Sequence, residues 1–227
     1  MCTPDTPLEG ADVLYSDQNL LILNKESGIS VIPGRGASGL HSLRWSAEKW
    51  IGRKLFVVHR IDHDTSGVVV FCRDAATHRL LSLQFQNREV IKWYYALVLG
   101  RMAGEGIIDE PVFEFGSGRM GVDPRGKPSQ TVYKVEEALE NATLLKLKPL
   151  TGRRHQIRVH LFSIGHPVMG DRLYGRQRPV GGVERLMLHA ASITFSYPGE
   201  RQFSINAPQD DLWNVIVERH RASSPAK

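Results

Sequence analysis

One short stretch of the chain carries several side chains that can do chemistry. Residues 59–67 read HRIDHDTSG, which places two imidazoles, a guanidinium and two carboxylates next to one another. Apolar segments rich in β-branched residues lie on both sides, at 56–58 and 68–72, and they favour strands. Because a rigid sheet can hold a polar turn in a fixed position, this stretch is a candidate for a reactive site.

A metal site is one interpretation of this stretch. His59, Asp62, His63 and Asp64 could bind a divalent ion and support hydrolysis. Against this, the neighbouring arginines would repel a dication, and the chain has no cysteine pair at the spacing of zinc ligands. A metal-dependent hydrolase is therefore the weaker alternative.

The other interpretation makes Asp62 a nucleophile. We expect Asp62 at the end of the strand that begins near Phe56, fixed and partly buried. Burial raises the pKa of a carboxylate unless a cation lies close, and the arginine-rich segment 153–160 supplies such a cation. A bidentate Arg–Asp pair would keep the carboxylate ionised and hold it in a fixed orientation. A purely structural ion pair explains the same residue types, and residue types alone favour it.

Composition limits the class of protein. The chain has 227 residues, 41% of them hydrophobic, which is enough for one large domain or two small ones. Its net charge of +5 suits a polyanionic partner, although many proteins are mildly basic without one. We find neither an apolar run long enough to span a membrane nor a signal peptide, and we expect Cys2 and Cys72 to be reduced thiols in a cytoplasmic protein.

The order of apolar patterns predicts an α+β fold, with a mixed, largely antiparallel β-sheet flanked by helices. Strands are expected at 13–15, 20–23, 29–32, 56–58, 68–72, 90–99, 130–135, 143–150, 186–195 and 202–205. Helices are expected at 40–51, 75–89 with Asp74 as N-cap, 154–164 and 210–218. In the 75–89 helix, Leu80, Leu81, Leu83, Gln84 and Phe85 are expected to mark the buried side. We expect a flexible leader at 1–10, a single catalytic domain at 11–220 and a disordered tail at 221–227.

The segment 104–128 is rich in glycine and polar residues, with a brief strand expected at Ile107-Ile108. Arg119, Arg125 and Lys127 lie among its glycines. A flexible loop that faces RNA and a long hairpin connection explain the segment equally well.

Six blocks of the sequence, in order, carry a family resemblance. They read NKESG at 24–28, HRIDHDTSG at 59–67, KWYYA at 92–96, LTGRRHQIRVH at 150–160, GHPVMGDRLYG at 165–175 and LHA at 188–190. Together they resemble the motifs of the RluA-type pseudouridine synthases and cover nearly the whole chain, as a short form without an S4 domain. One departure is Glu26, which stands where the family usually has proline.

The resemblance implies an isomerase that converts uridine to pseudouridine in RNA, with no cofactor and no metal. Asp62 matches the catalytic aspartate, which would attack either C6 of the uracil or C1′ of the ribose. Tyr94 matches the aromatic residue that stacks on the uracil, and Arg158 matches the basic residue that pairs with Asp62. Tyr95 is one residue out of register and would face the opposite way on a strand.

The resemblance also implies an RNA partner, either a tRNA stem-loop, a 23S rRNA hairpin or both. We expect the protein to be a monomer. The uridine must be flipped out of its stack before a carboxylate can reach it. Arg60 could contact the phosphate or fill the vacated stack, and Arg35, Lys127, Arg153 and Arg154 are expected to contact phosphates. A non-catalytic RNA-binding protein of the same fold is the remaining alternative.

Overall fold

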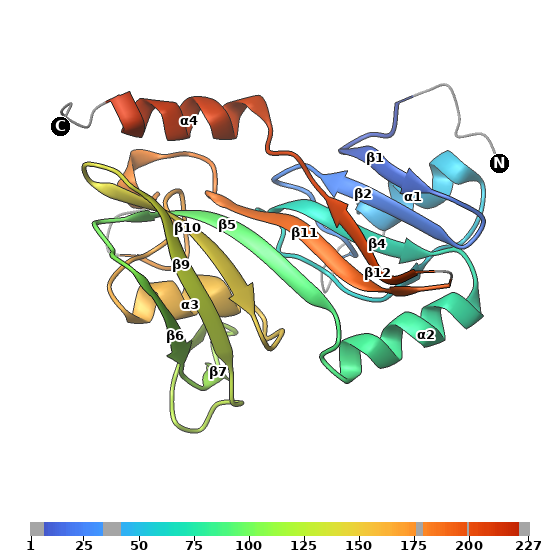
Figure 1. The fold of residues 1–227 in the computed structure, drawn as a ribbon, viewed down its shortest axis with the longest axis horizontal. Coiled ribbons are helices and arrows are strands. Elements are labelled where there is room, and N and C mark those ends of the chain that lie inside the picture. Colours follow the sequence, from blue (N-terminus) through green and yellow to red (C-terminus); the bar gives the residue numbers. More distant parts are fainter. Residues whose placement is uncertain (1–6, 34–41, 176–178, 199, 223–227) are drawn as a thin grey trace. The chain divides into compact units, whose positions relative to one another are not determined.

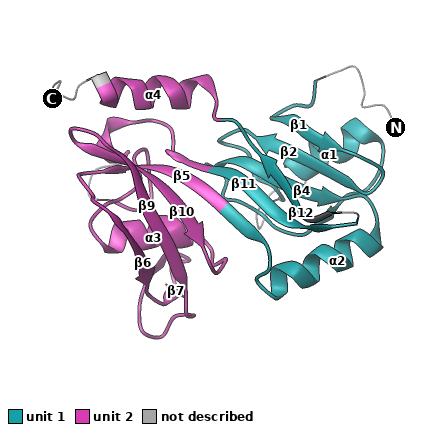
Figure 2. Ribbon diagram, viewed as in Figure 1, with its two compact units in different colours: residues 1–92, 190–208 teal, residues 93–189, 209–227 magenta. Residues whose placement is uncertain are grey.

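The computed structural model describes residues 7–33, 42–175, 179–198 and 200–222, and the chain forms two compact units (Figures 1 and 2). Unit 1 comprises residues 1–92 and 190–208, and unit 2 comprises residues 93–189 and 209–227. Strands β5 (Ile91–Leu99) and β11 (Leu188–Tyr197) contribute residues to both units. Each unit is described by itself below.

Unit 1 is built on a group of strands, most of whose neighbours run antiparallel. β1 (Ala11–Ser16), β2 (Leu20–Lys25), β4 (Ser66–Cys72) and β11 lie side by side in that order, while β3 (Phe56–Val57) pairs with β4 and β12 (Glu200–Asn206) pairs with β11. Every residue of β4 is buried, as its unbroken apolar sequence predicts for a central strand. This strand carries the end of the HRIDHDTSG stretch into the core of the unit.

The two helices of unit 1 begin at side-chain caps. α1 (Leu43–Ile51) starts where Ser42 Oγ accepts a hydrogen bond from the Trp45 N–H. α2 (Ala75–Gln86) starts where the Asp74 carboxylate accepts one from the Thr77 N–H at 2.9 Å, which confirms the predicted N-cap.

The predicted buried side of α2 is partly wrong. Leu80 and Leu83 are 42% and 50% exposed, whereas Leu81 and Gln84 are buried. Residues three apart share a helix face, so Leu80 and Leu83 lie together on the side that faces solvent, and Leu81 and Gln84 lie together on the buried side. The Gln84 amide lies inward because it both donates to and accepts from the backbone of Ser196.

Unit 2 contains a second antiparallel group, in the order β5, β10 (Ala142–Pro149), β9 (Gln130–Ala138) and β6 (Glu105–Asp109). β7 (Val112–Glu114) and β8 (Met120–Val122) form a separate hairpin. The 104–128 segment is therefore a strand, β6, followed by a hairpin; the expected strand at Ile107-Ile108 is confirmed as part of β6. The helical elements are α3 (Gln156–Ser163), the 3-10 turn Val180–Gly182 and α4 (Asp211–Ala222).

The register of unit 2 assigns side chains to two faces. Tyr94 lies opposite Leu147, which lies opposite Tyr133, so these three share one face, and Tyr95 points to the other. α3 packs on the Tyr94 face, and Figure 1 shows β9 and β10 drawn in front of it. α4 lies beside the far ends of β9 and β10, where the Arg221 guanidinium pairs with a glutamate of β9.

The predicted α+β fold with a largely antiparallel sheet is confirmed, but some element boundaries are wrong. Residues 29–32 form no strand, since only Ser30 makes an isolated bridge, to Ser42. The helix expected from residue 154 begins at Gln156, because His155 has a left-handed backbone with φ 54°. Within the described residues, no helix is long and apolar enough to cross a membrane. Most of the expected leader and tail falls outside the described residues, and the single catalytic domain stays a prediction.

Candidate active site

Asp62 lies in unit 1, in a turn that leads into β4. β3 ends at Val57, so the expected place of Asp62 at the end of a strand is wrong. The Thr65 N–H donates to the Asp62 carbonyl at 3.2 Å and closes the turn, and the Asp62 side chain is half-buried. A turn, instead of a strand, therefore sets the direction of this carboxylate.

Lys25 anchors the turn that contains Asp62. Its side chain is 1% exposed, and its ammonium group donates to the carbonyl oxygens of Glu26, Ile29 and His63 at 2.7, 2.7 and 2.9 Å. An ammonium has three donors, and these three contacts match that number. The buried lysine thus ties the 24–28 turn to the residue that follows Asp62.

Two further residues of the 24–28 turn reach the same segment. Ser27 Oγ donates to the Asp64 carbonyl at 2.6 Å, and the Gly28 N–H donates to the His63 carbonyl at 3.0 Å. The NKESG and HRIDHDTSG blocks, which lie far apart in the sequence, therefore form one hydrogen-bonded unit.

Gly67 fixes the other end of the stretch. Its φ is 113°, and a Cβ at this position would lie 2.2 Å from the Ala190 carbonyl oxygen. No side chain fits where β4 approaches β11 so closely. The glycine of HRIDHDTSG is thus required by packing, and it holds the turn against the LHA block.

We predict that Lys25→Met lowers both stability and activity. Methionine keeps the apolar stem but takes the ammonium donor from three carbonyl oxygens; the His63 oxygen keeps the Gly28 N–H, whereas those of Glu26 and Ile29 lose the donor described above. Since one unsatisfied buried group costs roughly 1–3 kcal/mol, the free energy of unfolding should fall by about 3 kcal/mol or more. Urea unfolding measures this loss, with the exposed Lys54→Met as control. Equal stability of both variants would contradict the anchoring role.

His59 plays a structural part in unit 1. Its Nε2 accepts the Val70 N–H at 2.9 Å, and its ring stacks on Phe85 with centroids 5.0 Å apart. Burial, together with the positive charge of Lys92, lowers the pKa of His59 to about 3. The ring is thus neutral at physiological pH, and the nitrogen that could bind a metal is already used. Among the described residues, no group of three or more His, Cys, Asp or Glu side chains is arranged to hold a metal ion.

The low pKa of His59 predicts acid sensitivity. The unfolded chain takes up this proton near pH 6.5 and the folded protein only near pH 3, so stability is present above pH 6.5 and is lost as the pH falls between these values. The slope from this residue is at most about 1.4 kcal/mol per pH unit. His59→Gln keeps an acceptor without a charge, and its urea-unfolding free energy should fall less steeply over this range. An identical slope in both proteins would contradict the assignment.

Arg158 lies in α3 of unit 2 and is held by Asp171. Its Nε and Nη2 donate to the two carboxylate oxygens at 2.7 and 2.9 Å, and the two side chains are only 3% and 0% exposed. The guanidinium also lies over the Tyr174 ring, 5.1 Å from its centroid. The two-pronged pair fixes the plane of the guanidinium and therefore the direction of its third nitrogen, Nη1.

Asp171 is itself fixed by the backbone. One of its oxygens accepts the N–H groups of Leu173 and Tyr174 at 2.8 and 3.0 Å. Residue types alone gave no role to this aspartate, although it lies in the GHPVMGDRLYG block. The predicted pairing of Arg158 with Asp62 joins residues of different units and stays a prediction.

Gln156 explains why the chain turns into α3 at this point. Its side-chain oxygen accepts from the Thr151 hydroxyl and the Arg153 N–H, and its amide nitrogen donates to the Gln130 carbonyl and the Thr131 hydroxyl. This buried amide joins the LTGRRHQ segment to β9. The same segment places His155 beside Tyr174, whose hydroxyl lies 2.7 Å from the imidazole Nδ1.

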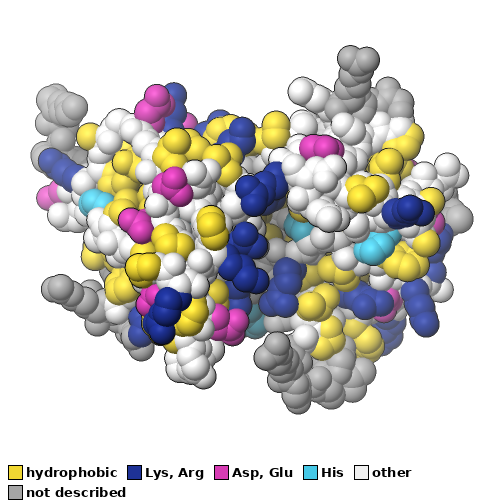
Figure 3. Space-filling view, turned by 90° about the horizontal axis from the view of Figure 1, so that it is seen from below, with side chains coloured by type: hydrophobic (Ala, Val, Ile, Leu, Met, Phe, Trp, Pro, Cys, Tyr) yellow, Lys and Arg dark blue, Asp and Glu magenta, His cyan; other side chains and the backbone are white. Residues whose placement is uncertain are grey.

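Tyr94, the other predicted catalytic residue of unit 2, is half-buried in β5 and shares the sheet face on which α3 packs. The predicted phosphate contacts are distributed over both units. Arg60, Lys127 and Arg154 are exposed, Arg153 is half-buried, and Arg35 lies outside the described residues. Figure 3 shows Lys and Arg side chains at the surface of both units.

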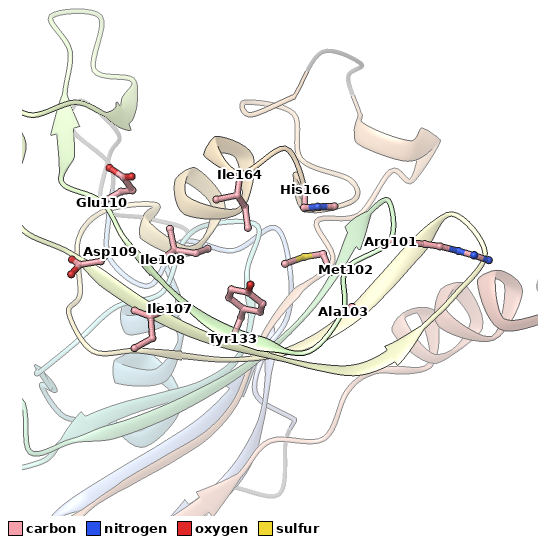
Figure 4. A pocket seen from close by; sticks show the side chains of 10 residues that line it. All are labelled: Arg101, Met102, Ala103, Ile107, Ile108, Asp109, Glu110, Tyr133, Ile164 and His166. Atoms are coloured by element: carbon pink, nitrogen blue, oxygen red, sulfur yellow. The ribbon is translucent and has the colours of Figure 1, made fainter.

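A pocket in unit 2 lies apart from these residues. Its volume is about 480 Å³, and Figure 4 shows Tyr133, Met102 and Ile164 lining it between β6 and the end of α3. Asp109 and Glu110 lie at one end. Since its lining includes none of the predicted site residues that the structure describes, this pocket is not the predicted active site.

The sequence of residues 19–163 matches the family model of the RNA pseudouridylate synthases. The chain belongs to this family. The predicted family and the predicted class of enzyme, a pseudouridine synthase, are both confirmed. In the family member described here, the HRIDHDTSG turn lies in unit 1, and Tyr94 and Arg158 lie in unit 2.

Individual relatives agree with this assignment. The chain is 39% identical over 224 residues to a protein of Vibrio vulnificus named ribosomal large subunit pseudouridine synthase C, covering 93% of this chain and 70% of that protein. It is 41% identical over 207 residues to the protein of the same name from Vibrio cholerae, covering 86% of this chain and 65% of that protein. The solved human RNA pseudouridylate synthase domain containing 1 is 25% identical and superposes with a TM-score of 0.77 over 99% of this chain and all of that chain.

Proposed function

We propose that this protein isomerises specific uridines to pseudouridine in large-subunit ribosomal RNA, with Asp62 as the nucleophile. The observation that supports this most directly is the double anchoring of the Asp62 turn, by Lys25 on one side and by Gly67 against β11 on the other. The names of the relatives support ribosomal RNA as the substrate. A tRNA stem-loop remains a second candidate substrate, on the resemblance to short family members alone.

In the proposed mechanism, the Asp62 carboxylate attacks either C6 of the uracil or C1′ of the ribose. The bond between the base and the sugar then breaks, the base turns, and C5 bonds to C1′ as the aspartate leaves. The proton on C5 is lost and one is gained at N1, so the overall reaction is an isomerisation without a redox step. Asp62 must be ionised for the attack, and Arg158 is the cation that we propose for this task.

Tyr94 is proposed to stack on the uracil and to assist removal of the C5 proton. Tyr94→Phe keeps the ring but lacks the hydroxyl. We expect a lower kcat, on the order of 10²-fold, with KM changed much less, since general base catalysis of this kind contributes about 10²–10⁴. Tyr95→Phe, on the opposite face, is the matched control. An unchanged kcat in Tyr94→Phe would restrict Tyr94 to stacking.

Mapping of pseudouridines tests the proposed function as a whole. Total rRNA and tRNA are compared from cells with and without the gene. One uridine, or a small set in similar sequences, should lose its modification in the large-subunit rRNA and regain it when the gene is restored. Loss only in tRNA would overturn the proposed substrate, and loss nowhere would overturn the proposed function.

A further inference from the structure

The sheet of unit 2 has a basic face opposite to Tyr94. Because side chains alternate along a strand, Trp93 and Tyr95 of β5 point to this side. Lys146 lies opposite Tyr95 in the register and opposite Lys134 on the next strand, and Lys148 follows two residues after Lys146. We call the set of Trp93, Lys134, Lys146 and Lys148 the lysine face.

Two lysines of this face are held over one ring. The Nζ atoms of Lys146 and Lys148 lie 4.9 and 5.6 Å from the centroid of the Trp93 ring, within the range of a cation–π interaction. Both lysines are half-buried, so their stems pack against the sheet while their charges stay near its surface. The tryptophan therefore restricts where the two ammonium groups can lie.

The lysine face carries more positive than negative charge. None of its three lysines forms an ion pair within the part of the chain that the structure describes. In the register, Glu105 is the only acidic residue directly opposite one of them, Lys134. Lys134 and Lys146 are themselves direct cross-strand neighbours, and like charges in that position destabilise a sheet.

An alternative is that the lysines only shield the half-buried Trp93 ring from water. Shielding by one lysine would be enough for that, and α1 has such a pair, in which Lys49 Nζ lies 5.1 Å from the Trp45 ring centroid. The lysine face instead gathers three lysines, two of them opposed across strands. An arrangement of positive charges that repel one another in the free protein is relieved when a polyanion binds.

We propose that the lysine face binds backbone phosphates of the RNA substrate at nucleotides away from the target uridine. This inference rests on the proposed function, which supplies the polyanion. Lysine acts as a point charge toward phosphate, and the Trp93 ring reduces the freedom that two of the lysines must lose on binding. The face lies on the opposite side of the sheet from Tyr94, so it adds to affinity and leaves the chemistry unchanged.

The test compares two double variants with the same change of net charge. Lys146→Gln/Lys148→Gln removes two charges of the lysine face, and Lys49→Gln/Lys54→Gln removes two charges elsewhere. Affinity for a transcript of 23S rRNA is measured from 50 to 200 mM salt, with Asp62→Asn in both proteins to prevent turnover. KM and kcat are measured with the same transcript in proteins that keep Asp62.

We expect the lysine-face variant to bind the transcript about tenfold more weakly at low salt, with a slope of log K against log salt that is smaller by about 1–2. Its KM should rise about tenfold with kcat unchanged, and the control should match the wild type. Equal affinity, slope and KM in the two double variants would overturn the inference. Wild-type protein that isomerises no uridine in this transcript would instead count against the proposed function, a separate outcome. An acidic protein that binds the face while RNA affinity is unchanged would also overturn the inference.

Discussion

Asp62→Asn is expected to abolish pseudouridine formation while RNA binding persists. The amide has nearly the same shape as the carboxylate but has no charge and is not a nucleophile at neutral pH. The turn itself should survive, since it is held by backbone contacts of Asp62, His63 and Asp64 and does not depend on the Asp62 side chain alone. The rate should fall by at least about 10⁴-fold, beyond the usual contribution of a general acid or base.

Asp64→Asn is the matched control for this experiment. Asp64 lies in the same turn, and its carboxylate contacts His63 Nδ1 at 2.6 Å on the surface. The Asp64→Asn variant should keep most of the activity. RNA affinity of both variants is measured with the same transcript, and pseudouridine is counted directly in the product. Appreciable turnover by an Asp62→Asn protein that is shown to carry asparagine at position 62 would refute Asp62 as the nucleophile.

Arg158→Met is expected to destabilise the protein by about 3–5 kcal/mol. Removing one partner of a buried ion pair leaves the other charge uncompensated, and Asp171 has no exposed surface. Arg158→Lys keeps the charge but cannot form the two-pronged contact, so its stability should fall less. If Arg158 also orients the Asp62 carboxylate, as we propose, the lysine variant should show a lower kcat as well, because a single ammonium cannot reproduce the geometry of the guanidinium.

Asp171→Asn separates the two roles of this pair. It leaves Arg158 in place with a weaker partner, so it should lower stability and loosen the guanidinium. A loss of stability with an unchanged kcat in both Arg158→Lys and Asp171→Asn would make the Arg158–Asp171 pair purely structural. Urea unfolding and kcat with the same transcript give both measurements.

Local patterns predicted much of the fold correctly. The all-buried sequence of β4 and the cap at Asp74 depend on neighbours in the chain, and the structure confirms both. Errors arose where a contact from far away decided the conformation. α3 starts two residues later than expected, at Gln156, whose side chain is held by β9. The predicted buried side of α2 was partly wrong because helical periodicity decides which residues point inward. The number of apolar residues nearby does not decide it.

The sequence by itself determined the family, the motif blocks and the identity of Asp62, Tyr94 and Arg158 as the residues to test. Only the tertiary structure decided what holds them. Lys25 reaches the carbonyl of His63, 38 positions along the chain, and Arg158 finds Asp171, because folding brings together groups whose separation in the sequence carries no signal. Strand register decided that Lys146 faces Lys134, since a shift by one residue would place them on opposite sides of the sheet. The HRIDHDTSG turn can thus be recognised as a motif in the sequence, but the residues that hold it in place lie far from it in the chain.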